Sequence, residues 1–325
     1  MKPFIFTLFL LFASASCLAQ TADAVSSGEK KYGIVNLSVC NLRAKPDFSS
    51  EMITQALLGM PVKLLQKQAW YYIQTPDDYT GWVHRAGVQL MTKAEYEAWN
   101  RTEKIVVTSL YGFTYEKPHR KAQTVSDVTG GDRLKWEGSQ GGFYEVSYPD
   151  GRRAYIDKSI SKPEKAWRAG LKKDANSLVR TAYTMMGIPY LWAGTSAKGM
   201  DCSGFVRTVL FLHDMIIPRD ASQQASVGER LEIAPACGNL QPGDLIFFGR
   251  KATAGIKERV SHVGIYIGHQ KFIHSMGDVH ISSFNPQDKE FDAYNLGRLL
   301  FAGRVLPFID KQVGLNTTLT NPYYY

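Results

Sequence analysis

The stretch GMDCSGF (residues 199–205) and the apolar run VRTVLFLH after it (206–213) decide how the second half of this chain is interpreted. Apolar residues recur at helical spacing, which predicts a helix from Cys202 to His213. Asp201 is a residue type that caps helix N-termini well, so Cys202 is expected in the first turn. The predicted buried face of this helix consists of Phe205, Val206, Val209 and Leu212.

A cysteine in the first turn of a helix is suited to nucleophilic catalysis. Its sulfur faces unpaired backbone N–H groups and the positive end of the helix dipole, which favour the thiolate and lower the pKa of the thiol. The same N–H groups can stabilise an oxyanion. A buried, unreactive cysteine is the alternative, and position alone leaves both interpretations of Cys202 open.

A cysteine nucleophile needs a base, and the base needs an orienting residue. Two histidines lie on neighbouring predicted strands, His262 in HVGIYIG (262–268) and His274 in KFIHS (271–275). A three-residue loop at 268–270 would pair position 264 with 274 and put both histidines on one face, where Gly264 leaves room. A two-residue loop would put them on opposite faces. Under the first condition, the first histidine is the predicted base and the second holds its tautomer.

The surrounding region, 165–308, is predicted to be an α+β domain. A helical pattern runs through 166–186 and stops at Gly187-Ile188-Pro189. Strands are then predicted at 244–249 and in the two histidine-bearing segments, which indicates an antiparallel sheet after the helices. The first helix is expected to bury Ala175, Leu178, Val179, Ala182 and Met186.

The N-terminal half of the chain reads as short strands and turns, and it repeats itself. YIQTPDDYTGWV (72–83) aligns without gaps on EVSYPDGRRAYI (145–156), and GMPVK (59–63) matches GDRLK (131–135). A repeat of this length in an all-β sequence predicts two small barrels in tandem.

The first residues predict export. A basic residue, an apolar run and a small-residue segment form a secretory signal peptide over 1–19, and lipidation of Cys17 is the alternative. The protein is therefore expected to be periplasmic or secreted. The predicted parts are the signal peptide 1–19, a barrel at 31–92, a helical linker at 92–102, a barrel at 103–160, the α+β domain at 165–308 and a polar tail at 309–325.

Composition narrows the function classes. The formal net charge is +8, but the basic residues are scattered, which suits an anionic wall polymer or simple solubility and gives no support for nucleic-acid binding. No later stretch approaches the roughly 18 apolar residues of a membrane span. The cysteine spacing fits no zinc pattern, so no metal or cofactor is expected. Cys40 and Cys237 are predicted to be buried, unpaired thiols.

Several motifs, taken in order, resemble the NlpC family of papain-like cell-wall cysteine peptidases over 165–308. The resemblance implies Cys202 as nucleophile, His262 as base and His274 as the third polar residue. One departure is Ala193, where the family usually has glycine. The motifs are GIPYLWAGTSAKGMDCSGFV (187–206), SHVGIYIG (261–268) and FIHS (272–275).

The tandem modules also resemble bacterial SH3-like domains, so the expected fold is two SH3-like β-barrels followed by an α+β papain-like domain. This layout resembles the γ-D-glutamyl-L-diamino acid peptidases. Those enzymes cut muropeptides with a free N-terminal L-Ala between D-Glu and meso-diaminopimelate or Lys. SSEMITQALLG (49–59) and DYTGWV (78–83) are close to the family's first-module pattern. The resemblance implies that Glu51 and Tyr79, with Asp201, bind the substrate's ammonium group.

The same resemblance implies roles for five more residues. Ser203 and Arg219 would hold the D-Glu carboxylate, and Asp220 would support the segment that carries the arginine. Tyr190 would place its hydroxyl near the oxyanion, and Trp192 would form a wall of the pocket. Each also has an ordinary structural explanation as a core or surface residue.

The implied partner is a peptidoglycan-derived peptide, and a monomer is favoured. Three alternatives remain open: an endopeptidase on intact wall with the barrels as tethers, an inactive wall-binding protein, and an acyltransferase. Glu51 and Tyr79 separate the first of these from a dipeptidyl-peptidase, because only the latter needs them for cutting.

Overall fold

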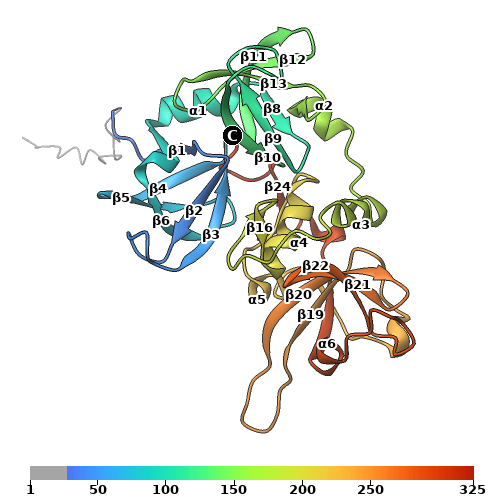
Figure 1. The fold of residues 1–325 in the computed structure, drawn as a ribbon. Coiled ribbons are helices and arrows are strands. Elements are labelled where there is room, and N and C mark those ends of the chain that lie inside the picture. Colours follow the sequence, from blue (N-terminus) through green and yellow to red (C-terminus); the bar gives the residue numbers. More distant parts are fainter. Residues whose placement is uncertain (1–27) are drawn as a thin grey trace, which may run out of the picture.

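The computed structural model describes residues 28–325, so the expected signal peptide and Cys17 lie outside the described residues. Two β-barrels and an α+β domain follow one another along the chain, the barrels in blue and green and the α+β domain in yellow to red (Figure 1). No helix in the described part is long and apolar enough to cross a membrane.

The first barrel is a seven-stranded sheet in the order β3-β2-β6-β5-β4-β1-β7. Alternate apolar side chains on its strands, including Leu42, Val62, Ile73 and Val83, fill its core. Its strands are β1 (Tyr32–Val35), β2 (Val39–Arg43), β3 (Met52–Leu57), β4 (Pro61–Lys67), β5 (Trp70–Gln74), β6 (Thr80–His84) and β7 (Val88–Met91).

The second barrel has the same strand order shifted along the chain, β10-β9-β13-β12-β11-β8-β14, which confirms the tandem repeat. Its sheet continues past the expected boundary at residue 160, because β14 pairs with β8. The strands are β8 (Lys104–Val107), β9 (Tyr111–Tyr115), β10 (Thr124–Thr129), β11 (Arg133–Gln140), β12 (Phe143–Ser147), β13 (Arg153–Asp157) and β14 (Ser161–Pro163).

The predicted linker helix is α1 (Lys93–Arg101). Thr92 and Glu95 form a reciprocal capping box at its start, which satisfies two orphan N–H groups. Tyr96 and Trp99 are buried in a small cluster with the first barrel. The linker is therefore packed onto the barrel along one face.

The α+β domain is built on a six-stranded antiparallel sheet in the order β18-β23-β19-β20-β21-β22. Helix α4 (Cys202–Phe211) packs against β20 and β21. All ten of its residues are buried, not only the predicted stripe. The strands are β18 (Glu229–Leu231), β19 (Leu245–Arg250), β20 (Arg259–Gly268), β21 (Lys271–Met276), β22 (Asp278–Ser283) and β23 (Leu299–Arg304).

The helical stretch predicted over 166–186 is two helices, because Gly170 ends the first and Asp174 caps the second. Met185 is buried in place of the predicted Met186, which is exposed. The remaining elements are α2 (Glu164–Ala169), α3 (Ala175–Thr184), β15 (Thr195–Ser196), β16 (Gly199–Met200), β17 (Met215–Ile216), α5 (Ala221–Gln224), α6 (Ala293–Gly297), β24 (Asn316–Thr317) and three short 3-10 helices (Arg85–Gly87, Pro235–Cys237 and Leu306–Phe308).

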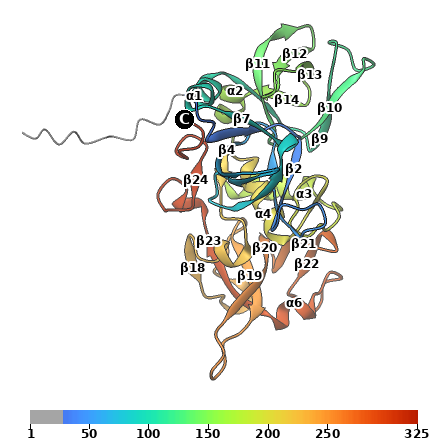
Figure 2. The same cartoon turned by 90° about the vertical axis from the view of Figure 1, so that its left-hand side faces the viewer.

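The C-terminal segment, to which the sequence pattern assigned nothing, ties the parts together. β24 pairs with β17 in the α+β domain. Further on, Asn321 Nδ2 donates to Pro76 O at 2.8 Å, and the Tyr96 hydroxyl donates to Tyr323 O. Tyr324 packs against the core of the first barrel. The chain therefore ends beside α1 (Figure 2).

Candidate active site

Cys202 is the first residue of α4, as predicted, and Asp201 is its N-cap, with Oδ1 accepting the Gly204 N–H at 2.7 Å. A Cβ on Gly204 would lie 2.0 Å from the Gly194 carbonyl oxygen. Only glycine therefore lets the first turn of α4 lie this close to the 191–194 segment.

The two histidines lie on one face of the sheet, and their rings are in direct contact. His262 Nε2 and His274 Nδ1 are 2.7 Å apart. A Cβ on Gly264 would lie 3.2 Å from His274 Cβ, so the glycine supplies the space between them. Cys202 and His262 line the same cleft.

The connection between the two histidine strands combines the shorter of the two loops considered with a bulge. His269 and Gln270 form a two-residue turn with positive φ angles of 53° and 60°, closed by the Gly268–Lys271 pair. A bulge at Ile267 inserts one extra residue into β20. The bulge restores the register that a two-residue turn alone would lose, so both histidines share a face.

The prediction of a lowered Cys202 pKa is wrong for this site. Burial, with the nearby Asp201 carboxylate, raises the pKa of the Cys202 thiol to about 11, although N–H groups of Val263 and Ser203 act in the opposite direction. Burial also lowers the pKa of His262 to about 4. The resting pair is therefore a neutral thiol beside a neutral imidazole, and the imidazole is free to act as a base.

Tyr190 and Trp192 both line the cleft. Burial raises the pKa of Tyr190 to about 12, with the nearby Cys202 thiol contributing, so its hydroxyl keeps its proton and can donate it. Trp192 is 61% exposed and is not a core residue. Its Nε1 donates to Glu51 Oε1 at 3.0 Å, which joins the α+β domain to the first barrel.

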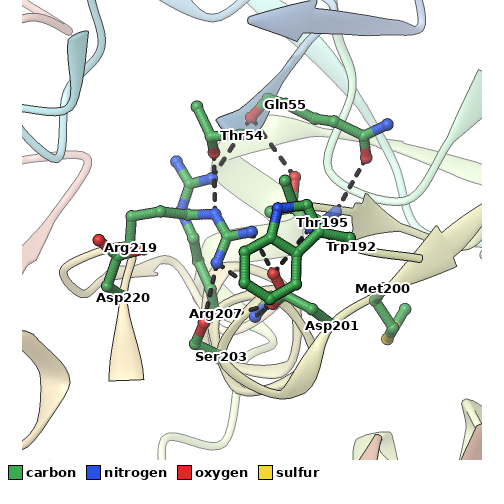
Figure 3. Close-up of polar contacts among 12 residues, drawn as sticks. Thr54, Gln55, Trp192, Thr195, Met200, Asp201, Ser203, Arg207, Arg219 and Asp220 are labelled. Carbon is green, nitrogen blue, oxygen red and sulfur yellow. Dashed lines mark hydrogen bonds and ion pairs between the residues drawn. The ribbon is translucent and has the colours of Figure 1, made fainter. Parts of the chain in front are cut away.

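Arg219 lines the cleft and is only 1% exposed. Its Nη2 donates to Asp201 Oδ2 at 2.6 Å, its Nη1 to Ser203 Oγ at 2.8 Å, and its Nε to Thr54 Oγ1 at 2.9 Å (Figure 3). All three guanidinium nitrogens thus have partners within the protein, and these contacts support the first turn of α4. The direct contact of Arg219 with a substrate carboxylate stays a prediction.

Asp201 is equally occupied. Its Oδ1 accepts from Gly204 N, Ser203 Oγ and Arg219, and its Oδ2 accepts from Ala193 N and Arg219. Five donors already contact this carboxylate, which uses most of its acceptor capacity. Asp201 also lines the cleft, and its ammonium-binding role stays a prediction.

Three other predicted residues remain open to a ligand. Glu51 and Tyr79, from the first barrel, line the cleft together with Asp220. The Tyr79 hydroxyl donates to Asp220 Oδ2 at 3.3 Å. Burial raises the pKa of Tyr79 to about 12, and burial also raises that of Asp220 above its ordinary value. The geometry thus brings together two carboxylates and a hydroxyl donor at the barrel side of the cleft.

The barrel is held against the α+β domain by a buried residue that sequence reasoning missed. Gln55 Oε1 accepts the Thr195 N–H at 2.8 Å (Figure 3). Its Nε2 donates to Asn41 Oδ1 at 2.9 Å. Arg207 adds a contact from α4 to the Gln55 carbonyl and an ion pair to Asp77. The quoted stretch 49–59 contains Gln55, but no local pattern marks it as an interdomain contact.

The cleft has a volume of about 390 Å³ and is lined by residues of both domains. Sequence reasoning also missed Ser222 and Arg259 on its wall. A second cavity of about 380 Å³ lies between the barrels and the C-terminal segment and contains none of the predicted site residues.

In residues 28–325, no group of His, Cys, Asp and Glu side chains forms a metal site. Cys40, Cys202 and Cys237 are all free and buried, which confirms the prediction made for Cys40 and Cys237.

Known proteins resemble this chain in sequence and in fold. The NlpC/P60 family profile matches residues 187–295, and the bacterial SH3 domain profile matches 38–89. A γ-D-glutamyl-L-lysine dipeptidyl-peptidase of Bacillus cereus is 32% identical over 236 residues, 70% of this chain and 68% of its own length. The dipeptidyl-peptidase 6 of Lysinibacillus sphaericus is 27% identical over 274 residues, 78% of this chain and 92% of its own. A crystal structure of an NlpC/P60 family protein from Bacillus cereus covers 85% of this chain and 100% of its own, at 26% identity and a TM-score of 0.71.

Proposed function

This chain belongs to the NlpC/P60 family of cysteine peptidases, and from that premise we propose that it is a muropeptide dipeptidyl-peptidase. Its substrate would be a peptide with a free N-terminal L-Ala, cut between γ-D-Glu and the diamino acid at the third position. The observation that carries the proposal is the group of Glu51, Tyr79 and Asp220 at the barrel side of the cleft.

The ammonium group of L-Ala would bind at this group. Two carboxylates facing one cleft need a cation, and a protonated amine supplies both the charge and three donors. An acetylated amine has no charge and adds bulk, so it would leave the carboxylates unpaired. Because the first barrel provides Glu51 and Tyr79, it would also close the cleft beyond the first residue of the substrate.

The chemistry would proceed through an acyl-enzyme. Cys202 Sγ attacks the γ-carbonyl carbon of D-Glu while the thiol proton passes to His262. The Tyr190 hydroxyl and N–H groups at the start of α4 would stabilise the oxyanion. The amide bond then breaks, and the proton on His262 goes to the departing amine. A water molecule, deprotonated by the same histidine, hydrolyses the thioester and regenerates the thiol.

Two synthetic peptides test the proposal: L-Ala-γ-D-Glu-meso-diaminopimelate with a free amine, and the same peptide acetylated. Cleavage followed by mass spectrometry, with Cys202→Ala as the blank, should occur for the free peptide only. Equal cleavage of both would contradict the ammonium site and favour an endopeptidase with the barrels as tethers. Absence of cleavage of these peptides and of the Lys analogue would contradict the proposed substrate class.

We also propose that the protein is exported to the periplasm or secreted, on the signal-peptide pattern at 1–19. N-terminal sequencing of the protein from its native host should find a mature chain that starts close to residue 20. An N-terminus at Met1 would contradict export by this signal. A mature chain that begins at a lipid-modified Cys17 would contradict cleavage near residue 20 and show a membrane-anchored protein.

A further inference from the structure

Beyond the two active-site histidines, the hydrogen bonds continue into the sheet. His274 Nε2 lies 3.1 Å from Ser282 Oγ on β22, and Ser282 Oγ donates to Asp292 Oδ2 at 3.0 Å. Asp292 is the N-cap of α6, and it also accepts from the backbone and side-chain nitrogens of Asn295. The chain of contacts from the base therefore ends at a carboxylate.

The carboxylate fixes the direction of this chain. An ionised carboxylate only accepts hydrogen bonds, so the Ser282 hydroxyl must donate its hydrogen bond to Asp292. Hydrogen bonds from Asn295 and Ser282 outweigh burial and hold the pKa of Asp292 below its ordinary value, so it is ionised at neutral pH. Ser282 then presents a lone pair to His274, and His274 Nε2 must carry a proton to donate to it.

The direction continues to the base. Burial lowers the pKa of His274 to about 2, so the ring is neutral and carries one proton only. With that proton on Nε2, its Nδ1 is an acceptor and takes the hydrogen bond from His262 Nε2. His262 is therefore protonated on Nε2, and its Nδ1 has the lone pair.

We propose that Ser282 and Asp292 are positioning residues that act through His274 to keep the Nδ1 of His262 unprotonated and ready to take the Cys202 proton. When that proton arrives, His262 carries protons on both nitrogens, and its Nε2–H still donates to His274. His280, whose ring centroid lies 4.5 Å from that of His274, the Asp201 carboxylate and the Arg298 guanidinium are the other titratable or charged groups that act on the pair. The proposal rests on the proposed function for its substrate assay but not for its chemistry.

Asp292→Asn is the first variant that tests it. Asparagine caps helices as well as aspartate does, so α6 is expected to keep its start. The asparagine amide can donate to Ser282, however. Every hydrogen bond between residue 292 and His262 can then reverse its direction, which puts the proton of His262 on Nδ1. We expect kcat to fall about 10- to 100-fold, the size typical for outer hydrogen-bond partners of functional histidines, with KM nearly unchanged.

Ser282→Ala removes the link while leaving the α6 cap in place. Because Asp292 is proposed to act only through Ser282, adding Asp292→Asn to this variant should cause no further loss. A double-mutant cycle on kcat measures this directly. Losses that multiply in the double variant would overturn the proposed link.

The same strand provides a matched control. Ser283, next to Ser282 on β22, donates to Asp288 Oδ2 at 2.7 Å, and this pair is not in the chain of contacts from His274. Ser283→Ala and Asp288→Asn should therefore leave kcat within about twofold of wild type. A loss as large as that of the Ser282 and Asp292 variants would show a general effect of β22 and contradict the proposal.

Alkylation of Cys202 by iodoacetamide provides a readout that needs no substrate. Its rate, followed by peptide mass spectrometry at Cys202, should fall in Asp292→Asn and Ser282→Ala and not in the two controls. If the wild-type protein cleaves no muropeptide but these rates fall, the proposed function fails and the positioning role stands. Unchanged alkylation rates and kcat in both variants would overturn the positioning role itself.

Discussion

Ala193 adopts a φ of 62°, which is the left-handed region where glycine is unstrained. It is also the position at which the sequence departs from its family's usual glycine. Its N–H donates to Asp201 Oδ2 at 3.0 Å, so the conformation is fixed by the support beneath the nucleophile. The chain thus carries backbone strain beside its active site.

Ala193→Gly should remove this strain. We expect the variant to be more stable by about 1 kcal/mol, the ordinary cost of a left-handed non-glycine residue, measured as a shift of the urea unfolding midpoint. A loss of stability would mean that the φ angle of Ala193 is not strained in solution.

Arg219 shows what residue type alone does not reveal. The family resemblance implies a substrate contact for Arg219, and the structure adds that this buried side chain is the partner of Asp201. Arg219→Gln leaves that carboxylate without its charge partner, and we expect a loss of about 3–5 kcal/mol in the free energy of unfolding. Arg259→Gln, an exposed arginine on the cleft wall, is the matched control and should change stability by less than about 0.5 kcal/mol.

The lowered His262 pKa predicts an unusual acid limb for catalysis. The neutral base is present above its pKa of about 4 and is lost as the pH falls through that value. Log kcat/KM against pH should therefore stay level from neutral pH down to about 5. On the alkaline side it should decline near the substrate amine pKa of about 7.7–8.0, because the ammonium is deprotonated. An acid limb near the ordinary histidine value of about 6.5 would contradict the neutral resting pair.

At the scale of elements, local signals predicted most of the framework. The tandem repeat predicted both barrels, because the same turn residues recur between β5 and β6 and between β12 and β13. Asp201 marked the start of α4 because a cap is a local feature. The sequence left the length of the β20–β21 connection open, since a bulge at Ile267 is not visible in an alternating apolar pattern.

That connection yields a prediction of its own. His269 and Gln270 both have positive φ, which Asn-Gly adopts more readily in a two-residue turn. Replacing the pair with Asn-Gly should raise Tm by about 2–4 °C, corresponding to about 1 kcal/mol, with kcat unchanged. A lower kcat would mean that the turn residues, and not only the bulge, set the register of the two histidines.

At the scale of the whole molecule, the site exists only because the parts are packed together. Glu51 and Tyr79 reach the cleft because two residues of β3 hold this strand to the α+β domain. Gln55 accepts from Thr195 of β15, and Thr54 accepts from Arg219. These contacts join residues about 140 or more positions apart, and no local pattern predicts them. The motif resemblance identified the cleft residues but not which of them are already paired.

The C-terminal segment belongs to the same scale. Deleting residues 321–325 removes the Asn321 contact with the first barrel, the buried Tyr323 and the partly buried Tyr324. We expect a lower Tm and a higher KM, with kcat changed less than KM, because the barrel would be held less firmly over the cleft. Equal Tm and KM in the truncated and full-length proteins would show that the segment does not hold the barrel in place.

The central claim is that the first barrel supplies a carboxylate for the substrate's ammonium group. The most direct test is the ratio of kcat/KM for the free peptide to that for the acetylated peptide, in wild type and in Glu51→Gln. Glu97→Gln, a partly buried glutamate on α1 that pairs with Lys93 and Arg101 away from the cleft, is the control. A hydrogen bond to a charged group contributes about 1.5–3 kcal/mol, so the ratio should fall about 10- to 100-fold in Glu51→Gln and stay unchanged in the control. An unchanged ratio in Glu51→Gln would contradict the claim.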